Sequence, residues 1–414
     1  MSGDGRVEDL LRSLAPKVLG ALVRRHRSFD LCEDAVQDAL VEAAAQWPER
    51  GIPDYPRAWL TTVATRRLID RVRSDNARRR REERVIVGAP PAEFMTTPAE
   101  ESERDRDDGL VLLLLSCHPA LSPTTQVALT LRAVGGLTTA EIAGAFFVPE
   151  ATMAQRISRA KQGIREAGAT FSMPPASEMQ DRLGAVLHVL YLIYNEGYTT
   201  SSGEVITRTD LTHEAIRLIR QLHLVRPDDA EVKGLLALML LTEARRPART
   251  DAVGRLVDLP DQDRRLWDRT LIDEGVCLVT EALQQGPPGV YQLQAAIAAI
   301  HDEASGPEDT DWAEILLLYQ LLDRIAPNPM ATLNRALAVA MVQGPEAGLR
   351  LLATLDNDKR VASHHRLSAM RGHLLQMAGD LASAKEAFET AARRCTSLPE
   401  RTYLQQRART AGSS

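Results

Sequence analysis

Residues 137–161 read LTTAEIAGAFFVPEATMAQRISRAK, and they contain two short helical patterns with a tight connection at 147–149 between them. Thr138 or Thr139 can cap the first helix, and Glu141 falls in its first turn, near the positive end of the helix dipole. Pro149 suits the start of the second helix, where its missing N–H leaves no bond unmade. The pattern therefore predicts two helices joined by a tight turn.

The second helix of this pair has two different faces. One face is an apolar stripe with helical spacing: Met153, Ile157, Ala160 and Ile164. The other carries short polar and cationic groups: Thr152, Gln155, Ser158, Arg159 and Gln162, with Arg156 and Lys161 on the flanks. A DNA-binding helix-turn-helix needs such a helix, because polar tips reach base edges and cations reach phosphates. An amphipathic hairpin with a solvated face has the same pattern, so both interpretations remain open from these residues.

The composition favours a multi-domain, all-α protein. A chain of 414 residues is long enough for two to three domains. Only 4% of the residues are aromatic and β-branched runs are scarce, while helix-forming residues dominate. The net charge of −6 excludes binding of nucleic acid by bulk charge, so any such surface must be a local patch.

The four cysteines do not form a metal or disulfide motif. Cys32, Cys117, Cys277 and Cys395 are far apart in the sequence, which is typical of free thiols in a reducing compartment. The N-terminus lacks a signal-peptide core, and apolar runs such as 110–115 are far too short to span a bilayer. We expect a cytoplasmic protein with no membrane partner.

Residues 7–84 read as one helical domain. In the helix that opens near Asp30, Val36 and Leu40 face one way, while Asp34, Asp38 and Val41 face the other. A valine between two outward carboxylates suggests a partner surface, and a solvated acidic face is the alternative. Pro16 is expected only near a helix start or break, and prolines are expected to turn 48–56 into a loop that contains Tyr55.

The next helix ends in the main cationic patch of the chain. Trp59, Leu60, Val63 and Ala64 form an apolar stripe, from which Leu68, Ile69 and Val72 rotate away. Residues 66–84 contain nine arginines and four acids, a net charge of +5, which suits a phosphate surface or a solvated helix end. Residues 88–108 then change to a Pro-containing acidic segment, with a net charge of −5 over 92–108, and predict an extended, disordered linker.

A second small helical domain follows at 109–168. Residues 110–118 read as a buried helix, and Ser122 with Pro123 can start the next one as cap and first residue. Gly135 and Gly136 end that helix just before the helix-turn-helix pattern.

Four motifs in this order carry a family resemblance: DAVQDAL at 34–40, WLTTVATRRLID at 59–70, LSP with LTLR at 121–132, and the helix-turn-helix. With the linker between the second and third, the chain closely resembles the two-domain sigma factors of the extracytoplasmic-function (ECF) group of the sigma-70 family over about residues 7–168. The resemblance implies a region 2 domain at 1–86, a linker at 87–108, and a region 4 helix-turn-helix domain at 109–170.

The resemblance also implies partners and site residues. The helix near Asp34 would dock on the β′ subunit of core RNA polymerase, through Asp34, Gln37, Asp38 and Val41. The promoter −10 element, with a flipped base held by the 48–56 loop, would be read by Tyr55, Trp59, Thr62, Arg66, Arg67, Arg71 and Arg73. The −35 element would be read by Thr152, Gln155, Arg156, Ser158, Arg159 and Lys161. The linker would pass through the RNA channel region of the polymerase, so contact with the β subunit is expected as well.

Residues 177–414 form an extension that a minimal sigma factor does not have. Helices of about 12 to 16 residues alternate with short breaks, and Gly372, Ala384 and Phe388 fall at tetratricopeptide spacing in the unit 363–395. A degenerate tetratricopeptide-like (TPR-like) array follows from this pattern, with a protein or peptide as a possible ligand. The stretch Tyr194, Asn195, Glu196, Gly197 and Tyr198 is either a core helix ending at a glycine or a regulatory docking surface. The sigma-like part, the 194–198 stretch and the TPR-like array together resemble a subgroup of sigma factors that has a long C-terminal TPR-like extension.

No enzyme constellation is present in the sequence. There is no Gly-rich phosphate loop or HExxH, and the adjacent pair His364 and His365 would diverge on a helix. We expect no catalytic residue, metal or cofactor. The sequence predicts a sigma factor for −10 and −35 recognition, regulated in cis by its C-terminal domain. The alternatives are a helix-turn-helix regulator that is not a sigma subunit, and a TPR-type scaffold.

Overall fold

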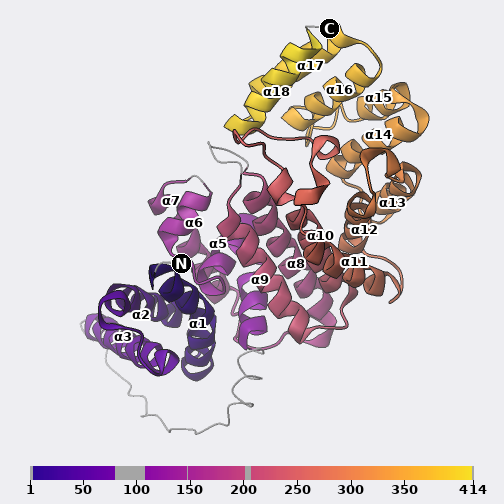
Figure 1. Ribbon diagram of the computed structural model, residues 1–414. Coiled ribbons are helices and arrows are strands. Elements are labelled where there is room, and N and C mark those ends of the chain that lie inside the picture. Colours follow the sequence, from indigo (N-terminus) through magenta and orange to yellow (C-terminus); the bar gives the residue numbers. More distant parts are fainter. Residues whose placement is uncertain (1–2, 80–107, 147, 201–206, 413–414) are drawn as a thin grey trace. The chain divides into compact units, whose positions relative to one another are not determined.

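The computed structural model describes residues 3–79, 108–146, 148–200 and 207–412, and within these ranges the chain is all-α (Figure 1). It divides into two compact units, residues 1–193 and 194–414, and the division falls inside one long helix, α8 (Ala176–Tyr198). Most of the linker predicted at 87–108 lies outside the described residues. No helix in the described ranges is both long enough and apolar enough to cross a bilayer.

The first unit begins with three long helices, α1 (Gly3–His26), α2 (Phe29–Arg50) and α3 (Pro56–Arg79). They pack through apolar faces: Val36, Leu40 and Ala43 of α2 are buried, as are Leu60, Ala64 and Leu68 of α3. The inward face predicted for α2 is therefore confirmed. The expectation that Leu68 rotates off the α3 stripe was wrong, because Leu68 is buried one turn after Ala64, whereas Ile69 and Val72 are exposed as predicted.

Two proline expectations were wrong. Pro16 lies in the interior of α1, and α2 runs through Pro48 to Arg50, so the expected loop at 48–56 starts three residues late. A proline removes only one backbone donor, and here the buried Trp47, whose ring meets that of Trp59 edge-on at 5.5 Å, fixes the last turn of α2. The helix ends instead at Arg50 and is capped by Gly51. Gly51 has a φ of +85°, which glycine can adopt at no steric cost.

The helix-turn-helix consists of α6 (Thr139–Ala145) and α7 (Glu150–Glu166), and it follows a helical segment at 108–116 and helix α5 (Pro123–Ala133). Thr138 caps α6: its hydroxyl accepts a bond from the Glu141 N–H, and the Glu141 carboxylate accepts one from the Thr138 N–H. This reciprocal capping box confirms the predicted cap and fixes the start of the motif.

The second unit consists of successive antiparallel helices after the end of α8. In order they are α9 (Thr209–Val225), α10 (Ala230–Ala244), α11 (Arg269–Leu283), α12 (Val290–Glu303), α13 (Trp312–Ile325), α14 (Pro329–Gln343), α15 (Pro345–Ala353), α16 (His365–Met377), α17 (Leu381–Arg394) and α18 (Leu398–Ala411). Short 3₁₀ turns occur at Arg246–Ala248, Leu259–Asp261, Arg264–Leu266 and Pro307–Asp309. The repeated helix pairs confirm the predicted helical array.

The best-defined predicted repeat is the pair α16 and α17, which lie side by side (Figure 1). A Cβ on Gly372 would stand 2.9 Å from the ring of Phe388, so only glycine allows these helices to approach so closely. Ala384, Phe388 and Ala391 are buried in the same interface. Small residues where the helices cross, with a large residue between them, are what the sequence pattern predicts.

Candidate nucleic-acid and polymerase interface

The second helix of the helix-turn-helix, α7, buries its apolar stripe and exposes its polar face. Met153, Ile157, Ala160 and Ile164 are each at most 5% exposed, which confirms the predicted inner face. Gln155, Ser158 and Arg159 are exposed, and Thr152 and Arg156 are half-buried. These five residues lie where a helix in the major groove would present side chains to bases and phosphates.

Helix α3 and the turn before it also present polar groups to solvent. Tyr55 is 78% exposed, and Thr62, Arg66 and Arg73 are exposed as well. Trp59 is half-buried because its ring packs edge-on against Trp47. An exposed aromatic ring at the start of a helix that carries exposed cations further along can stack on an unpaired base while the cations contact the backbone.

Two other arginines of α3 are held by acids of α2. Arg67 donates to Glu42 at 2.8 Å, and Arg71 pairs with Asp38 at 2.6 Å and with Asp34 at 3.0 Å. The bond from Arg67 is the main reason that the pKa of the Glu42 carboxyl is lowered. Arg67 and Arg71 would therefore contact DNA phosphates by exchanging one anionic partner for another.

The predicted polymerase-docking face of α2 is partly open and partly covered. Val41 is 63% exposed and Asp38 is partly exposed, so this end of the face is available to a partner. Gln37 is buried, and its amide donates to the backbone oxygen of Arg132 at 3.4 Å. Asp34 is partly exposed but has two cationic partners, Arg71 and Lys161.

Lys161 lies at the centre of an ion network between α2 and α7. Its ammonium lies 2.5 Å from Asp34, 3.0 Å from Glu33 and 3.3 Å from Asp30. Only 10% of the lysine side chain is exposed. Burial is the largest influence and lowers the pKa of Lys161, but the carboxylates of Glu33 and Asp34 outweigh it and raise the pKa above its ordinary value. In this conformation the ammonium is directed to α2 and not to solvent.

Several residues that sequence reasoning missed complete this contact. Glu33 is 1% exposed and also accepts from Arg132 at 2.8 Å, and Arg165 lies 3.3 Å from Asp30. A separate ion pair joins α1 to α6, where Arg12 donates to Glu141 at 2.9 Å. The burial of Glu33 could have been predicted from the sequence, because it lies on the inward face of α2, three residues before Val36. A buried acid in that position needs a cationic partner.

The structure thus joins residues from all three predicted interfaces. Arg71 from the predicted −10 face, Asp34 from the polymerase face and Lys161 from the −35 helix belong to one continuous set of ion pairs. Gln155, Ser158 and Arg159 are outside this set, on the solvent side of α7.

The tyrosine stretch at the end of α8 is mainly core. Tyr194 is 2% exposed and donates to the Met239 backbone oxygen, and Tyr198 stacks on it at 5.9 Å with the Arg249 guanidinium over its ring. The expected glycine cap was wrong: α8 continues past Gly197, where a Cβ would stand 2.7 Å from the Thr212 nitrogen. In this stretch Asn195 is exposed, so a docking role is left mainly to it and the half-buried Glu196.

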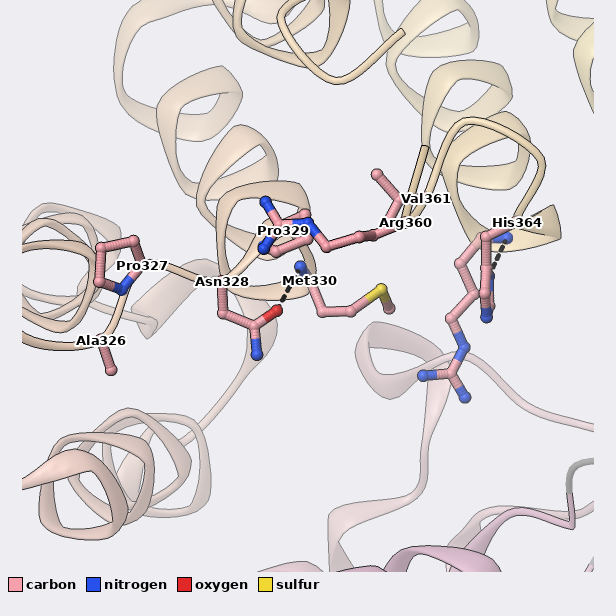
Figure 2. A pocket seen from close by; sticks show the side chains of 9 residues that line it. Ala326, Pro327, Asn328, Pro329, Met330, Arg360, Val361 and His364 are labelled. Carbon is pink, nitrogen blue, oxygen red and sulfur yellow. Dashed lines mark hydrogen bonds between the residues drawn. The ribbon is translucent and has the colours of Figure 1, made fainter. Parts of the chain in front are cut away.

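An open hollow of about 680 Å³ lies between the starts of α14 and α16 (Figure 2). Its polar side chains already serve the fold. Asn328 caps α14 by accepting from the Met330 N–H, His364 caps α16 by accepting from the Arg366 N–H, and Arg360 pairs with Asp358. The hollow therefore offers few groups for binding a ligand.

Three family descriptions match parts of the chain. Sigma-70 region 2 matches residues 10–79, and Sigma-70, region 4 matches residues 112–162. A family of unknown function (DUF6596) matches residues 182–283, which include most of α8 and extend to α11.

The chain is also similar to individual proteins, over nearly all of its length in one case and over about a third of it in others. An uncharacterized protein of Rhizobium meliloti (strain 1021) is 43% identical over 413 residues, covering 98% of this chain and 95% of that protein. The ECF RNA polymerase sigma factor SigK of Mycobacterium ulcerans (strain Agy99) is 30% identical over 155 residues, which is 36% of this chain and 78% of SigK. SigK of Mycobacterium sp. (strain JLS) is 29% identical over 160 residues, covering 36% and 74%.

Proposed function

This chain belongs to the ECF group of sigma-70 family sigma factors, and from that membership we propose that it directs core RNA polymerase to promoters by reading −35 and −10 elements. In this role it binds polymerase and DNA and performs no bond chemistry itself. The exposed surfaces of the first unit support this role, since fold alone does not assign a function.

The −35 element would be read by α7. The observation that carries this proposal is the separation of faces on that helix: its apolar stripe is buried, while Gln155, Ser158 and Arg159 are exposed. A glutamine amide can pair with adenine and an arginine guanidinium with guanine in the major groove. Thr152 and Arg156, half-buried beside them, would contact phosphates or the groove edge, and Lys161 could join only after leaving α2.

The −10 element would be read by the start of α3. Tyr55 and Trp59 lie on either side of the first turn of that helix, and Thr62, Arg66 and Arg73 follow on exposed positions. Unstacking a base costs a few kcal/mol, which stacking on an aromatic side chain offsets by about 1–3 kcal/mol. Arg67 and Arg71 would add phosphate contacts after exchange of their α2 partners.

Polymerase would dock on the exposed part of α2, around Asp38 and Val41, with Asp34 and Gln37 added when the helix-turn-helix moves away. Covered Gln37 and paired Asp34 support this order of events. The ion pairs of the isolated chain would then be exchanged for pairs with polymerase and DNA.

Run-off transcription with purified core polymerase tests the proposal. We expect promoter-dependent transcripts only when this chain is added, and their loss with Arg159→Ala. If the chain binds promoter duplex but core polymerase yields no transcript, it is a helix-turn-helix regulator and not a sigma subunit. If Arg159→Ala leaves transcription unchanged, the reading helix is assigned wrongly.

Regulation in cis would come from the second unit. The supporting observation is that residues 194–414 form a compact helical unit larger than the sigma regions need, joined to them through the continuous helix α8. The test compares transcription by the full chain with that by residues 1–200, which keep all of α8. A change in promoter-dependent transcription per bound polymerase supports cis regulation, and equal transcription refutes it.

A further inference from the structure

Three side chains that can bind a metal ion meet in the second unit. His365 is the first residue of α16, Cys395 follows the end of α17, and Glu400 lies in the first turn of α18. The Nε2 atom of His365 is 3.2 Å from Oε2 of Glu400, and Sγ of Cys395 is 3.6 Å from the same oxygen. All three ligand atoms lie within 4.8 Å of one another, and no other such group occurs among the described residues.

These separations suit a tetrahedral zinc ion. Zinc binds sulfur at about 2.3 Å, nitrogen at about 2.0–2.1 Å and oxygen at about 2.0–2.2 Å. At tetrahedral angles those lengths place nitrogen about 3.4 Å and sulfur about 3.6 Å from the oxygen. The His365–Glu400 and Cys395–Glu400 distances are within about 0.2 Å of these values. The third pair, Nε2 of His365 and Sγ of Cys395, lies within 4.8 Å and would have to approach to about 3.6 Å for the site to close.

The environment of the three groups also suits a bound ion. The Cys395 residue is 1% exposed, and the His365 and Glu400 side chains are largely covered. The buried Nε2 of His365 makes no hydrogen bond of good geometry, although it lies beside Glu400. A buried polar atom without a hydrogen bond costs free energy, and a metal ion on its lone pair would remove that cost.

We propose that His365, Cys395 and Glu400 form a Zn²⁺ site, with Cys395 bound as the thiolate. A thiolate and an imidazole select zinc over magnesium or calcium, which prefer oxygen ligands. The fourth ligand would come from a cavity of about 300 Å³ that His365 and Glu400 line together with Arg249 and Tyr403. A water molecule or a small anion in that cavity would complete the coordination.

Neighbouring groups hold the ligands in place. Arg401 donates two hydrogen bonds to the backbone oxygen of Cys395, and Arg366 lies 3.9 Å from the other oxygen of Glu400. In known metal sites, such contacts orient the side chains that bind the ion. A bound ion would tie α16, the end of α17 and α18 together at one point. The sequence did not reveal the site, because His365 meets its partners only after three helices have folded.

The test uses the full chain, stripped with a chelator under reducing conditions and then titrated with Co²⁺ and Zn²⁺. We expect one Co²⁺ per chain, with a thiolate-to-cobalt charge-transfer band and the intense visible bands of a tetrahedral site. Zn²⁺ should displace Co²⁺ and raise the melting temperature of the chain.

Variants decide whether these three residues bind the ion. Cys395→Ser, His365→Gln and Glu400→Gln should each weaken binding at least about 100-fold, with unchanged far-ultraviolet circular dichroism. The controls are Cys277→Ser, an exposed thiol elsewhere, and His364→Asn, which removes the neighbouring imidazole but keeps a helix cap. Both controls should bind normally. Absence of stoichiometric binding, or binding that survives the three substitutions, would overturn the proposal.

Discussion

Replacing Lys161 with methionine should make the isolated chain bind core polymerase more tightly. The substitution keeps the length and apolar stem of the side chain but removes the ammonium that holds Asp30, Glu33 and Asp34 to α7. The contact between α2 and the helix-turn-helix is then weakened, and the proposed polymerase-docking face of α2 is uncovered more often.

The structure sets the expected size of the effect. Breaking a buried ion pair by removing one partner costs about 3–5 kcal/mol. Here Glu33 keeps Arg132 and Asp34 keeps Arg71, and the side chains of Asp30 and Asp34 are about a third exposed, so solvent screens part of the loss. We therefore expect the contact to weaken by about 2 kcal/mol, a factor of about 30 in the closed-to-open ratio.

The assay is equilibrium binding of labelled chain to core polymerase without DNA. If only an open form exposes the whole of the proposed docking face, the apparent dissociation constant should fall by up to about 30-fold. Arg159→Met is the matched control: it removes a cation from the same helix, but from its exposed face, and should leave this affinity unchanged.

Unchanged or weaker polymerase binding by Lys161→Met would refute the reasoning, since it would mean that the ion network does not oppose docking. A tightening shared equally by Arg159→Met would do the same, because it would show a general effect of charge.

Three further predictions concern single residues. Arg159→Ala should weaken binding of −35 duplex by about 1–3 kcal/mol in fluorescence anisotropy, with wild-type melting as the control. Gly197→Ala should destabilise the second unit by about 2 kcal/mol in urea unfolding because its Cβ meets the Thr212 nitrogen at 2.7 Å, whereas Gly184→Ala in the same helix, with nothing within 4 Å, should not destabilise. Burial lowers the pKa of His301 from 6.5 to about 4. Between these pH values, His301 is protonated in the unfolded chain but neutral in the folded chain. Stability should therefore fall by up to about 3 kcal/mol as the pH drops from about 6.5 to 4, and His301→Gln should reduce this fall; an equal fall in that variant would contradict the assignment.

Local patterns in the sequence predicted much of the fold. The capping box at Thr138, the buried stripe of α7 and the close crossing at Gly372 each depend on residues within a few turns of helix. Local propensity failed at Pro16 and Pro48, where packing of the helix faces outweighs the loss of one backbone donor.

The candidate surfaces were predictable only as single faces. The sequence indicates that Asp34 and Lys161 are exposed charges, but not that they meet, because 127 residues separate them. Pairing between distant elements depends on how the two helical groups pack. Similarly, the role of Gly197 is set by α9 passing against α8, and the sequence does not show which helix will cross it.

Through the contacts of Lys161, the binding of promoter duplex and the binding of polymerase to the first unit would affect each other. Since its ammonium is bound by α2 carboxylates, a promoter fragment that recruits the lysine must also release those carboxylates. If polymerase raises the affinity for duplex by opening this contact, duplex must raise the affinity for polymerase by the same factor. Both ligands shift the same equilibrium between the closed and open forms. Assembly of the initiation complex would then be cooperative even where the two ligands never touch.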